Sequence, residues 1–273
     1  MKPVTRVYHR WYLCKGKEHV TSYADGVSSL SPSAEVLGFF PQWLAGMPAD
    51  WPKQLKLVGF TLAERCVDDS ALEPALRSFL AAAHESSSPV FAFAAGSAPP
   101  PYASKYFETA VKACRLLGAK AVLLCTVAGI VPHPLPEHCY HASFAPFSAL
   151  LQHVAVFGFN GGIGGASEAL RAGTPQVRGA ALVHRWRRPD SLASQLITPG
   201  RFDQPDNAAR MVRLGVAARL DIADFSVRRC AAALDKLRSE PSVRAACAAA
   251  AAHFSQPVQT SAAQAAQHVA ALV

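Results

Sequence analysis

The sequence lacks the features of a membrane-spanning protein or of a disulfide-linked secreted protein. Residues 1–20 contain no apolar segment of the kind found in signal peptides. The most apolar late run, AACAAAAAHF (245–254), is short and mostly alanine, which favours a packed helix over a membrane span. The seven cysteines are odd in number and form no CxxC pair, which argues against a disulfide framework or a zinc site. A cytoplasmic protein is therefore expected.

Charge is also scarce. Only 17% of the residues are charged and 51% are hydrophobic, which is the composition of a globular protein. The length of 273 residues allows one large domain or two small ones. The net charge of +8 is concentrated in two basic clusters. One comprises Lys2, Arg6, Arg10, Lys15 and Lys17, and the other comprises Arg178, Arg185, Arg187 and Arg188. No nucleic-acid-binding signature accompanies them, so we interpret them as solvated surface and expect no nucleic-acid partner. Peripheral binding at the inner face of the membrane is the alternative.

Strand-like and helix-like segments alternate from about residue 55 onward. The predicted strands are 55–60, 89–97, 120–126 and 153–159, and the predicted helices are 71–85, 102–118, 227–237, 242–254 and 261–272. This alternation predicts an α/β fold, a Rossmann-like parallel sheet flanked by helices, with residues 55–220 in one sheet. Ligands bind such sheets at the carboxyl ends of the strands, and we expect residues 159–168 and 203–207 to converge at that edge. Residues 1–30 are polar and turn-rich and do not follow the pattern.

A glycine-rich stretch, FNGGIGGASEALRAGTPQ (159–176), follows the last predicted strand. Such a turn lets the backbone approach a ligand, and it directs unpaired N–H groups and the helix dipole at an anion. The dinucleotide fingerprint is not met, because Ser167 occupies the third glycine position, and the Lys-Ser/Thr end of a P-loop is absent. By itself, the stretch is equally consistent with a tight turn that binds no ligand.

A second stretch, FDQPDNAARMVRLGV (202–216), places four polar residues at the start of a predicted helix. They are Asp203, Gln204, Asp206 and Asn207. Carboxylate and amide side chains accept hydrogen bonds from sugar hydroxyls, and amides also donate to them. The alternative is a helix cap made by Asp203 or Asp206, which accounts for one of these residues but not for all four.

Together, these stretches resemble the C-terminal donor domain of GT-B glycosyltransferases, in the branch of sterol glucosyltransferases and rhamnolipid rhamnosyltransferases. The similar stretches are LGFFPQWLAGMPADWP (37–52), AAGSA (94–98), FAPFSALLQHVAVF (144–157), GGIGGASEALRAGTPQ (161–176) and DQPDNAARMVRLGV (203–216). The resemblance implies a nucleotide-sugar donor-binding domain over residues 37–273, with residues 1–36 as an extension or linker remnant.

The resemblance also implies roles for individual residues. Gly96 and Ser97 would face the diphosphate, Ala145 and Phe147 would hold the base, and the N–H groups of Gly161, Gly162 and Gly164 would bind the diphosphate. Glu168 would contact the ribose, and Asp203 and Gln204 would grip the donor sugar. The donor would be a dTDP- or UDP-sugar, with no cofactor and no metal, and the catalytic residues stay unknown.

The chain departs from the family pattern in three ways. The motif His-His-Gly-Gly-x-Gly-Thr begins here with Phe159 and Asn160 and carries Gly165 in place of Thr, so the diphosphate loses an imidazole and a hydroxyl. An insertion over residues 177–194 interrupts the pattern and begins like a partial second copy, with His184 as a relic of the phosphate His or a loop residue without a ligand. No counterpart of the family's N-terminal acceptor domain is found, so a separately encoded N-terminal half is an expected partner.

We expect a glycosyltransferase-like protein that moves a hexosyl or rhamnosyl group from a nucleotide-diphosphate sugar to a lipid or other small acceptor. A truncated, non-catalytic remnant or a nucleotide-sugar-binding partner subunit is the alternative. A nucleotide-sugar epimerase is less favoured, because the Asp203-Gln204 pair resembles transferases.

Overall fold

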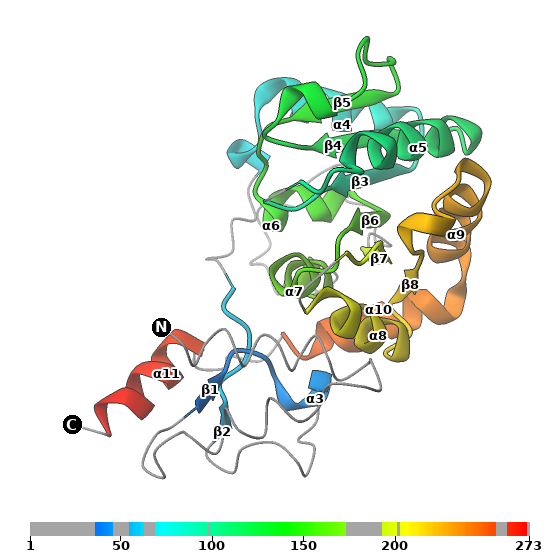
Figure 1. Ribbon diagram of the computed structural model, residues 1–273. Helices are drawn as coiled ribbons and strands as arrows, with labels where there is room; N and C mark the ends of the chain where they lie inside the picture. The colour runs from blue at the N-terminus through cyan, green and yellow to red at the C-terminus, as the bar shows by residue number, and fades with distance from the viewer. Residues whose placement is uncertain are drawn as a thin grey trace.

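The computed structural model describes residues 36–45, 55–62, 69–97, 99–172, 193–200, 203–254 and 261–271. Its centre is a six-stranded, fully parallel sheet in the order β5-β4-β3-β6-β7-β8 (Figure 1). The strands are β3 (Val90–Ala94), β4 (Lys120–Leu124), β5 (Cys139–Ala142), β6 (Val156–Phe159), β7 (Ser194–Ile197) and β8 (Ala217–Arg219). The predicted α/β class, a Rossmann-like parallel sheet flanked by helices, is confirmed.

Helices cover both faces of the sheet. The helices are α4 (Pro74–Glu85), α5 (Ala103–Leu116), α6 (Phe147–Leu150), α7 (Ile163–Ala172), α8 (Gln204–Arg213), α9 (Val227–Ser239) and α10 (Pro241–Ala252). Along β3, Phe91 and Phe93 pack with α5 and α9, whereas Ala92 and Ala94 pack with the other helices, as the alternation of side chains along a strand requires. Both faces are buried over the inner strands β3, β4 and β6, which explains why these strands are apolar except for Lys120.

One predicted strand lies in a different sheet. Residues 55–57 form β2 (Leu55–Leu57), which pairs in parallel with β1 (Val36–Gly38) and not with the six-stranded sheet. The expectation that residues 55–220 form one sheet is wrong at this end. The apolar run was identified correctly, but its partner was set by tertiary pairing. The two edge strands β5 and β8 were not predicted, because short edge strands lack a continuous apolar run.

The small sheet is tied to the large one through α3 (Gln42–Ala45) and the C-terminal helices. The Trp43 ring stacks on His253 with centroids 4.4 Å apart, and Arg210 of α8 donates a 2.8 Å hydrogen bond to the Ala45 carbonyl. Ser261, the first residue of α11 (Ser261–Ala270), donates to the carbonyl of Phe60 at 2.7 Å. The domain boundary at residue 37 stays a prediction.

The expected insertion over 177–194 is described only at its end. Ala193 and Ser194 are buried and Ser194 begins β7, so the end of the insertion is packed into the core and is not an exposed loop. Residues 177–192, including His184, lie outside the described segments, as do the two basic clusters. In the described segments, no helix has both the length and the apolar character needed to cross a bilayer.

Candidate functional site at the carboxyl edge

The glycine-rich turn and the start of α8 meet at the carboxyl edge of the sheet, as predicted. Asn207 makes the connection: its Nδ2 donates to the Gly161 carbonyl at 3.0 Å and to Asp203 Oδ2 at 2.8 Å. Asn207 is fully buried, so its bond to the Gly161 carbonyl is shielded from water, whereas the bond to Asp203 is partly buried. Two segments more than forty residues apart are thereby fixed side by side.

The other polar residues of α8 have separate roles. Asp203 occupies the N-cap position but makes no side-chain capping bond, so capping does not account for it. Gln204 Oε1 accepts a hydrogen bond from the Gly200 N–H at 2.9 Å, and Asp206 pairs with Arg210 at 2.7 Å. Asp203 and Gln204, predicted to grip the donor sugar, thus lie together beside the glycine turn.

Glycine is required at one position of this turn and at one position of the loop after β3. Gly161 has φ +85°, and a Cβ atom there would lie 2.7 Å from Ile197 Cγ2. Gly96, in the loop after β3, has φ +87°, and the carboxamide nitrogen of Asn160 fills the space that a Cβ atom on residue 96 would need. Both positions combine left-handed backbone with close approach, which only glycine accommodates.

Asn160 also contacts one of the predicted diphosphate donors. Its Oδ1 accepts a hydrogen bond from the Gly162 N–H at 3.2 Å. Of the three N–H groups expected to bind the diphosphate, the one on Gly162 therefore already has an acceptor. Sequence reasoning treated Asn160 only as a lost histidine and missed this contact.

Phe159, which replaces the first histidine of the family motif, is built into the core. Its ring is 3% exposed and stacks on Phe157 with centroids 4.7 Å apart. The same ring lies against Gly165, in the first turn of α7, where a Cβ atom would be 3.0 Å from Phe159 Cδ2. The two departures from the family motif are therefore physically linked: with Phe159 in place, residue 165 has little room for a side chain.

The remaining predicted residues lie around this edge. Ala145 is buried and Phe147 is half-buried, with its ring 5.1 Å from that of Phe157. Glu168, on α7, pairs with Arg171 at 2.5 Å, so its carboxylate has a partner before any ribose is bound. Ser97 is exposed in the loop after β3. The structure gathers the candidate residues at one edge, and their individual roles toward a donor stay predictions.

A small pocket opens at the same edge, between the start of α5 and the ends of β3, β6 and β7. Its polar lining residues are Tyr102, Tyr106, Asn160 and Thr198, and the others are Ala, Pro and Phe. Burial raises the pKa of the Tyr106 hydroxyl well above its usual range, so this group stays protonated. Sequence analysis placed Tyr106 only within the predicted helix 102–118. No signal in the sequence indicated that its hydroxyl reaches the carboxyl edge.

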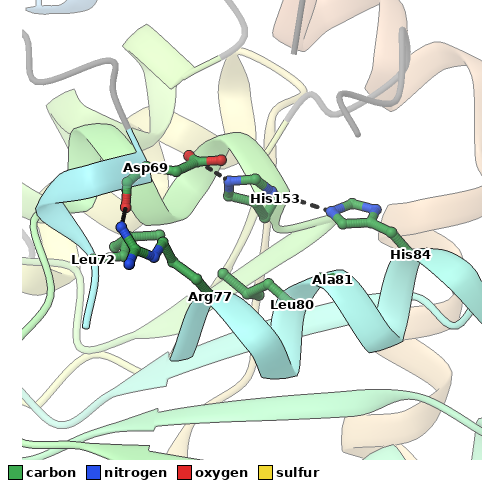
Figure 2. A pocket seen from close by; sticks show the side chains of 7 residues that line it. All are labelled: Asp69, Leu72, Arg77, Leu80, Ala81, His84 and His153. Atoms are coloured by element: carbon green, nitrogen blue, oxygen red, sulfur yellow. Dashed lines mark hydrogen bonds and ion pairs between the residues drawn. The ribbon is translucent and has the colours of Figure 1, made fainter. Parts of the chain in front are cut away.

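A second pocket is lined by two histidines and an aspartate (Figure 2). His84 Nε2 lies 3.1 Å from His153 Nδ1, and His153 Nε2 lies 2.9 Å from Asp69 Oδ1. His84 ends α4 just before β3, and His153 ends a short 3-10 helix (Leu151–His153) just before β6. The histidines are therefore at the amino edge of the sheet, opposite the glycine turn, and we interpret the chain of bonds as a structural bridge between α4 and the 3-10 helix.

The described cysteines are buried and free. Burial raises the pKa of Cys139, Cys230 and Cys247 to about 12. A thiol that stays protonated at neutral pH is neither a nucleophile nor a metal ligand. Within the described segments, no group of three His, Cys, Asp or Glu residues could hold a metal ion.

The fold and this edge define a Rossmann-like domain with a glycine-rich turn at the usual ligand position. No family model matches the sequence. Over 188 residues, the chain is 29% identical to O-mycaminosyltylonolide 6-deoxyallosyltransferase of Streptomyces fradiae. The aligned region covers 69% of this chain and 38% of the relative.

Two examples illustrate the similarity in fold to solved structures. The glycotransferase of kitacinnamycin has a TM-score of 0.62 and 23% identity, covering 87% of this chain and 54% of that one. The glycosyltransferase VinC, in complex with dTDP, has a TM-score of 0.60 and 20% identity, covering 87% of this chain and 52% of that one. The chain spans about half the length of these structures. Its fold is similar to that of the matching part of these two glycosyltransferase structures.

Proposed function

We propose that the chain binds a nucleotide-diphosphate sugar at the carboxyl edge of the sheet and serves as the donor-binding part of a glycosyltransferase. The observation that carries the proposal is the Asn207 link, which holds the glycine turn and the Asp203-Gln204 pair together. A diphosphate and the sugar attached to it are neighbours in one molecule, so the groups that bind them must lie side by side, as these two segments do. The similarity to VinC, which was solved with dTDP, supports the same donor class.

The chain's own contribution to transfer would be to bind the donor and stabilise the departing diphosphate. An acceptor hydroxyl would attack the anomeric carbon and give its proton to a base supplied with the acceptor, and the bond from that carbon to the diphosphate oxygen would break. The N-terminus of α7, with the exposed Gly164 in its first turn, offers N–H groups and a favourable helix dipole to the leaving anion. A hexosyl or rhamnosyl donor, a lipid or other small acceptor, and membership of the sterol and rhamnolipid branch are part of the same proposal.

A non-catalytic binding subunit is the second candidate, and Asn160 favours it. With its Oδ1 on the Gly162 N–H, one anion-binding donor is satisfied internally. Phe159 and Gly165 further lack the imidazole and hydroxyl that the resemblance would place near the diphosphate. These features predict weak donor binding and leave turnover dependent on residues supplied by a partner.

Calorimetric titration of the purified chain with dTDP, UDP, dTDP-glucose and UDP-glucose tests the proposal. We expect at least one nucleotide to bind saturably. Asp203→Asn should weaken the binding of the sugar nucleotide, because Asp203 is proposed to contact the sugar. Asp235→Asn is the matched control, because Asp235 is half-exposed on α9 and forms an ion pair with Arg238, three residues away on the same helix. Absence of binding to all four ligands by a folded chain would remove the proposed function. Turnover of a sugar nucleotide in the same samples would separate the enzyme from the binding subunit.

A further inference from the structure

The pocket between the start of α5 and the ends of β3, β6 and β7 contains two hydroxyls without partners. Tyr106 is 3% exposed and Thr198 is 2% exposed, and neither hydroxyl oxygen has a hydrogen-bond partner. Each comes from a different element, α5 or the end of β7, and both line the same pocket. Because buried polar groups are nearly always paired, two orphans in one pocket indicate that a polar group belongs there.

The size and charge of the pocket restrict that group. The pocket holds a group about the size of one water molecule. None of its lining residues is charged. Four are polar, namely Tyr102, Tyr106, Asn160 and Thr198, and the others are alanine, proline and phenylalanine. A phosphoryl oxygen would bring negative charge into this apolar lining without a cation, which is unfavourable. A neutral hydroxyl fits, because it can both donate and accept with Tyr106 and Thr198.

The position of the pocket connects it with the donor sugar. Tyr102, at its rim, has its hydroxyl close to Gly200, whose N–H is bonded to Gln204 Oε1. On another side, Asn160 separates the pocket from the Gly162 N–H. Tyr102 and Asn160 are only half-buried, so the pocket reaches the surface between the diphosphate turn and the sugar-gripping pair.

We propose that this pocket receives one hydroxyl group of the donor sugar, through the hydroxyls of Tyr106 and Thr198. The inference rests on the proposed function and adds two specificity-determining residues that the family motif does not contain. An ordered water is the other occupant that would satisfy both hydroxyls, and it predicts different behaviour on mutation.

Isosteric removal of each hydroxyl tests the proposal. Tyr106→Phe and Thr198→Val are titrated with dTDP, UDP, dTDP-glucose, UDP-glucose and dTDP-rhamnose, and their Tm values are measured without ligand. The Kd for a bound sugar nucleotide is expected to rise about two- to tenfold, the effect of one lost hydrogen bond, while the Kd for the matching nucleoside diphosphate stays unchanged. The ligand-free Tm is expected to stay level or rise, because each variant removes a buried group without a partner.

Two control variants remove hydroxyls elsewhere. Thr109→Val changes a second buried threonine, which lies on α5, and Tyr140→Phe changes a tyrosine on the edge strand β5. Neither residue lines the pocket. Both controls are expected to bind every nucleotide like the wild type.

The outcomes separate the inference from the function on which it depends. Suppose that the wild type binds nucleotides, and that both variants change the Kd for sugar nucleotides and the Kd for nucleoside diphosphates equally or not at all. The inference is then overturned and the proposed function stands. A lower ligand-free Tm in both variants, with unchanged sugar-nucleotide binding, identifies an ordered water and also overturns it. If the wild type binds none of the five ligands, the proposed function fails and the inference fails with it.

Discussion

The ring of Phe159 occupies the space that a side chain on residue 165 would need. It stacks on Phe157 beneath the first turn of α7, and an added Cβ atom at Gly165 would be 3.0 Å from it. This contact explains why the chain carries phenylalanine and glycine together where the resembling family has histidine and threonine. Replacing either residue alone would leave a mismatched pair.

Gly165→Thr is accordingly expected to destabilise the protein by about 1–3 kcal/mol, the usual effect of overpacking a core. In a Phe159→Leu background the additional loss should be smaller, because the ring is gone, and a double-mutant cycle from urea denaturation measures this coupling. Gly164→Thr is the matched control, since an added Cβ at Gly164 meets nothing within 4 Å. Equal losses for threonine at 164 and 165 would refute the steric explanation.

Asn160 is expected to compete with the diphosphate for the Gly162 N–H. Asn160→Ala frees this donor and should tighten nucleoside diphosphate binding by up to about tenfold, the upper range for one hydrogen bond. Asn160→Asp keeps the acceptor and adds a negative charge, so it should weaken binding. Calorimetry with dTDP and UDP measures both. Weaker binding by Asn160→Ala would instead identify the carboxamide as a ligand contact.

Asn207→Asp tests the link between the glycine turn and α8. The substitution keeps the shape of the side chain but replaces two N–H bonds with a carboxylate facing the Gly161 carbonyl and Asp203. We expect the free energy of unfolding to fall by about 3–5 kcal/mol, as for other uncompensated buried charges. Thermal denaturation measures the effect, and Asp206→Asn, on the same helix, serves as the control. A Tm like that of the wild type would show that the link is dispensable.

His153 is expected to matter for stability and not for nucleotide binding. His153→Ala removes the bonds to His84 and Asp69, which join the end of α4 to the 3-10 helix before β6 (Figure 2). A loss of about 1–3 kcal/mol should follow, because two partly buried hydrogen bonds are removed. The Kd for dTDP or UDP should be unchanged in the folded variant, because the histidines lie at the opposite edge of the sheet. A large change in Kd at constant stability would assign the cluster a role in binding.

The buried cysteines predict alkaline sensitivity. Because burial raises the pKa of Cys230 and Cys247 from an ordinary value of 9.0 to about 12, the unfolded chain releases these protons at lower pH than the folded chain. Their contribution to stability is therefore complete below about pH 9 and declines as the pH rises toward 12. Denaturation midpoints at increasing pH measure this trend. Cys230→Ala and Cys247→Ala, each compared with the wild type at every pH, should flatten it.

The sequence predicted the central fold well because its signals are local. Buried parallel strands such as PVFAFAAGS are short apolar runs, and helices such as the one containing Tyr106 carry apolar residues at helical spacing. The prediction failed at Leu55–Leu57, an apolar run whose partner strand β1 lies outside the main sheet. A strand's partner depends on tertiary pairing, which a local pattern does not contain.

For the candidate site, the sequence by itself determined which segments come together. It predicted that the glycine turn after strand 153–159 and residues 203–207 converge at the carboxyl edge of the sheet. The strand β7, which brings residues 203–207 to that edge, was not among the predicted strands. Only the tertiary structure decided which contacts these groups make. Asn160 accepts a hydrogen bond from the Gly162 N–H, Phe159 packs against Gly165, and Tyr106 and Thr198 line one pocket. Backbone periodicity fixes the face and the edge of a residue. Contacts between side chains distant in sequence depend on rotamers and packing, and these exist only once the sheet and its helices have assembled.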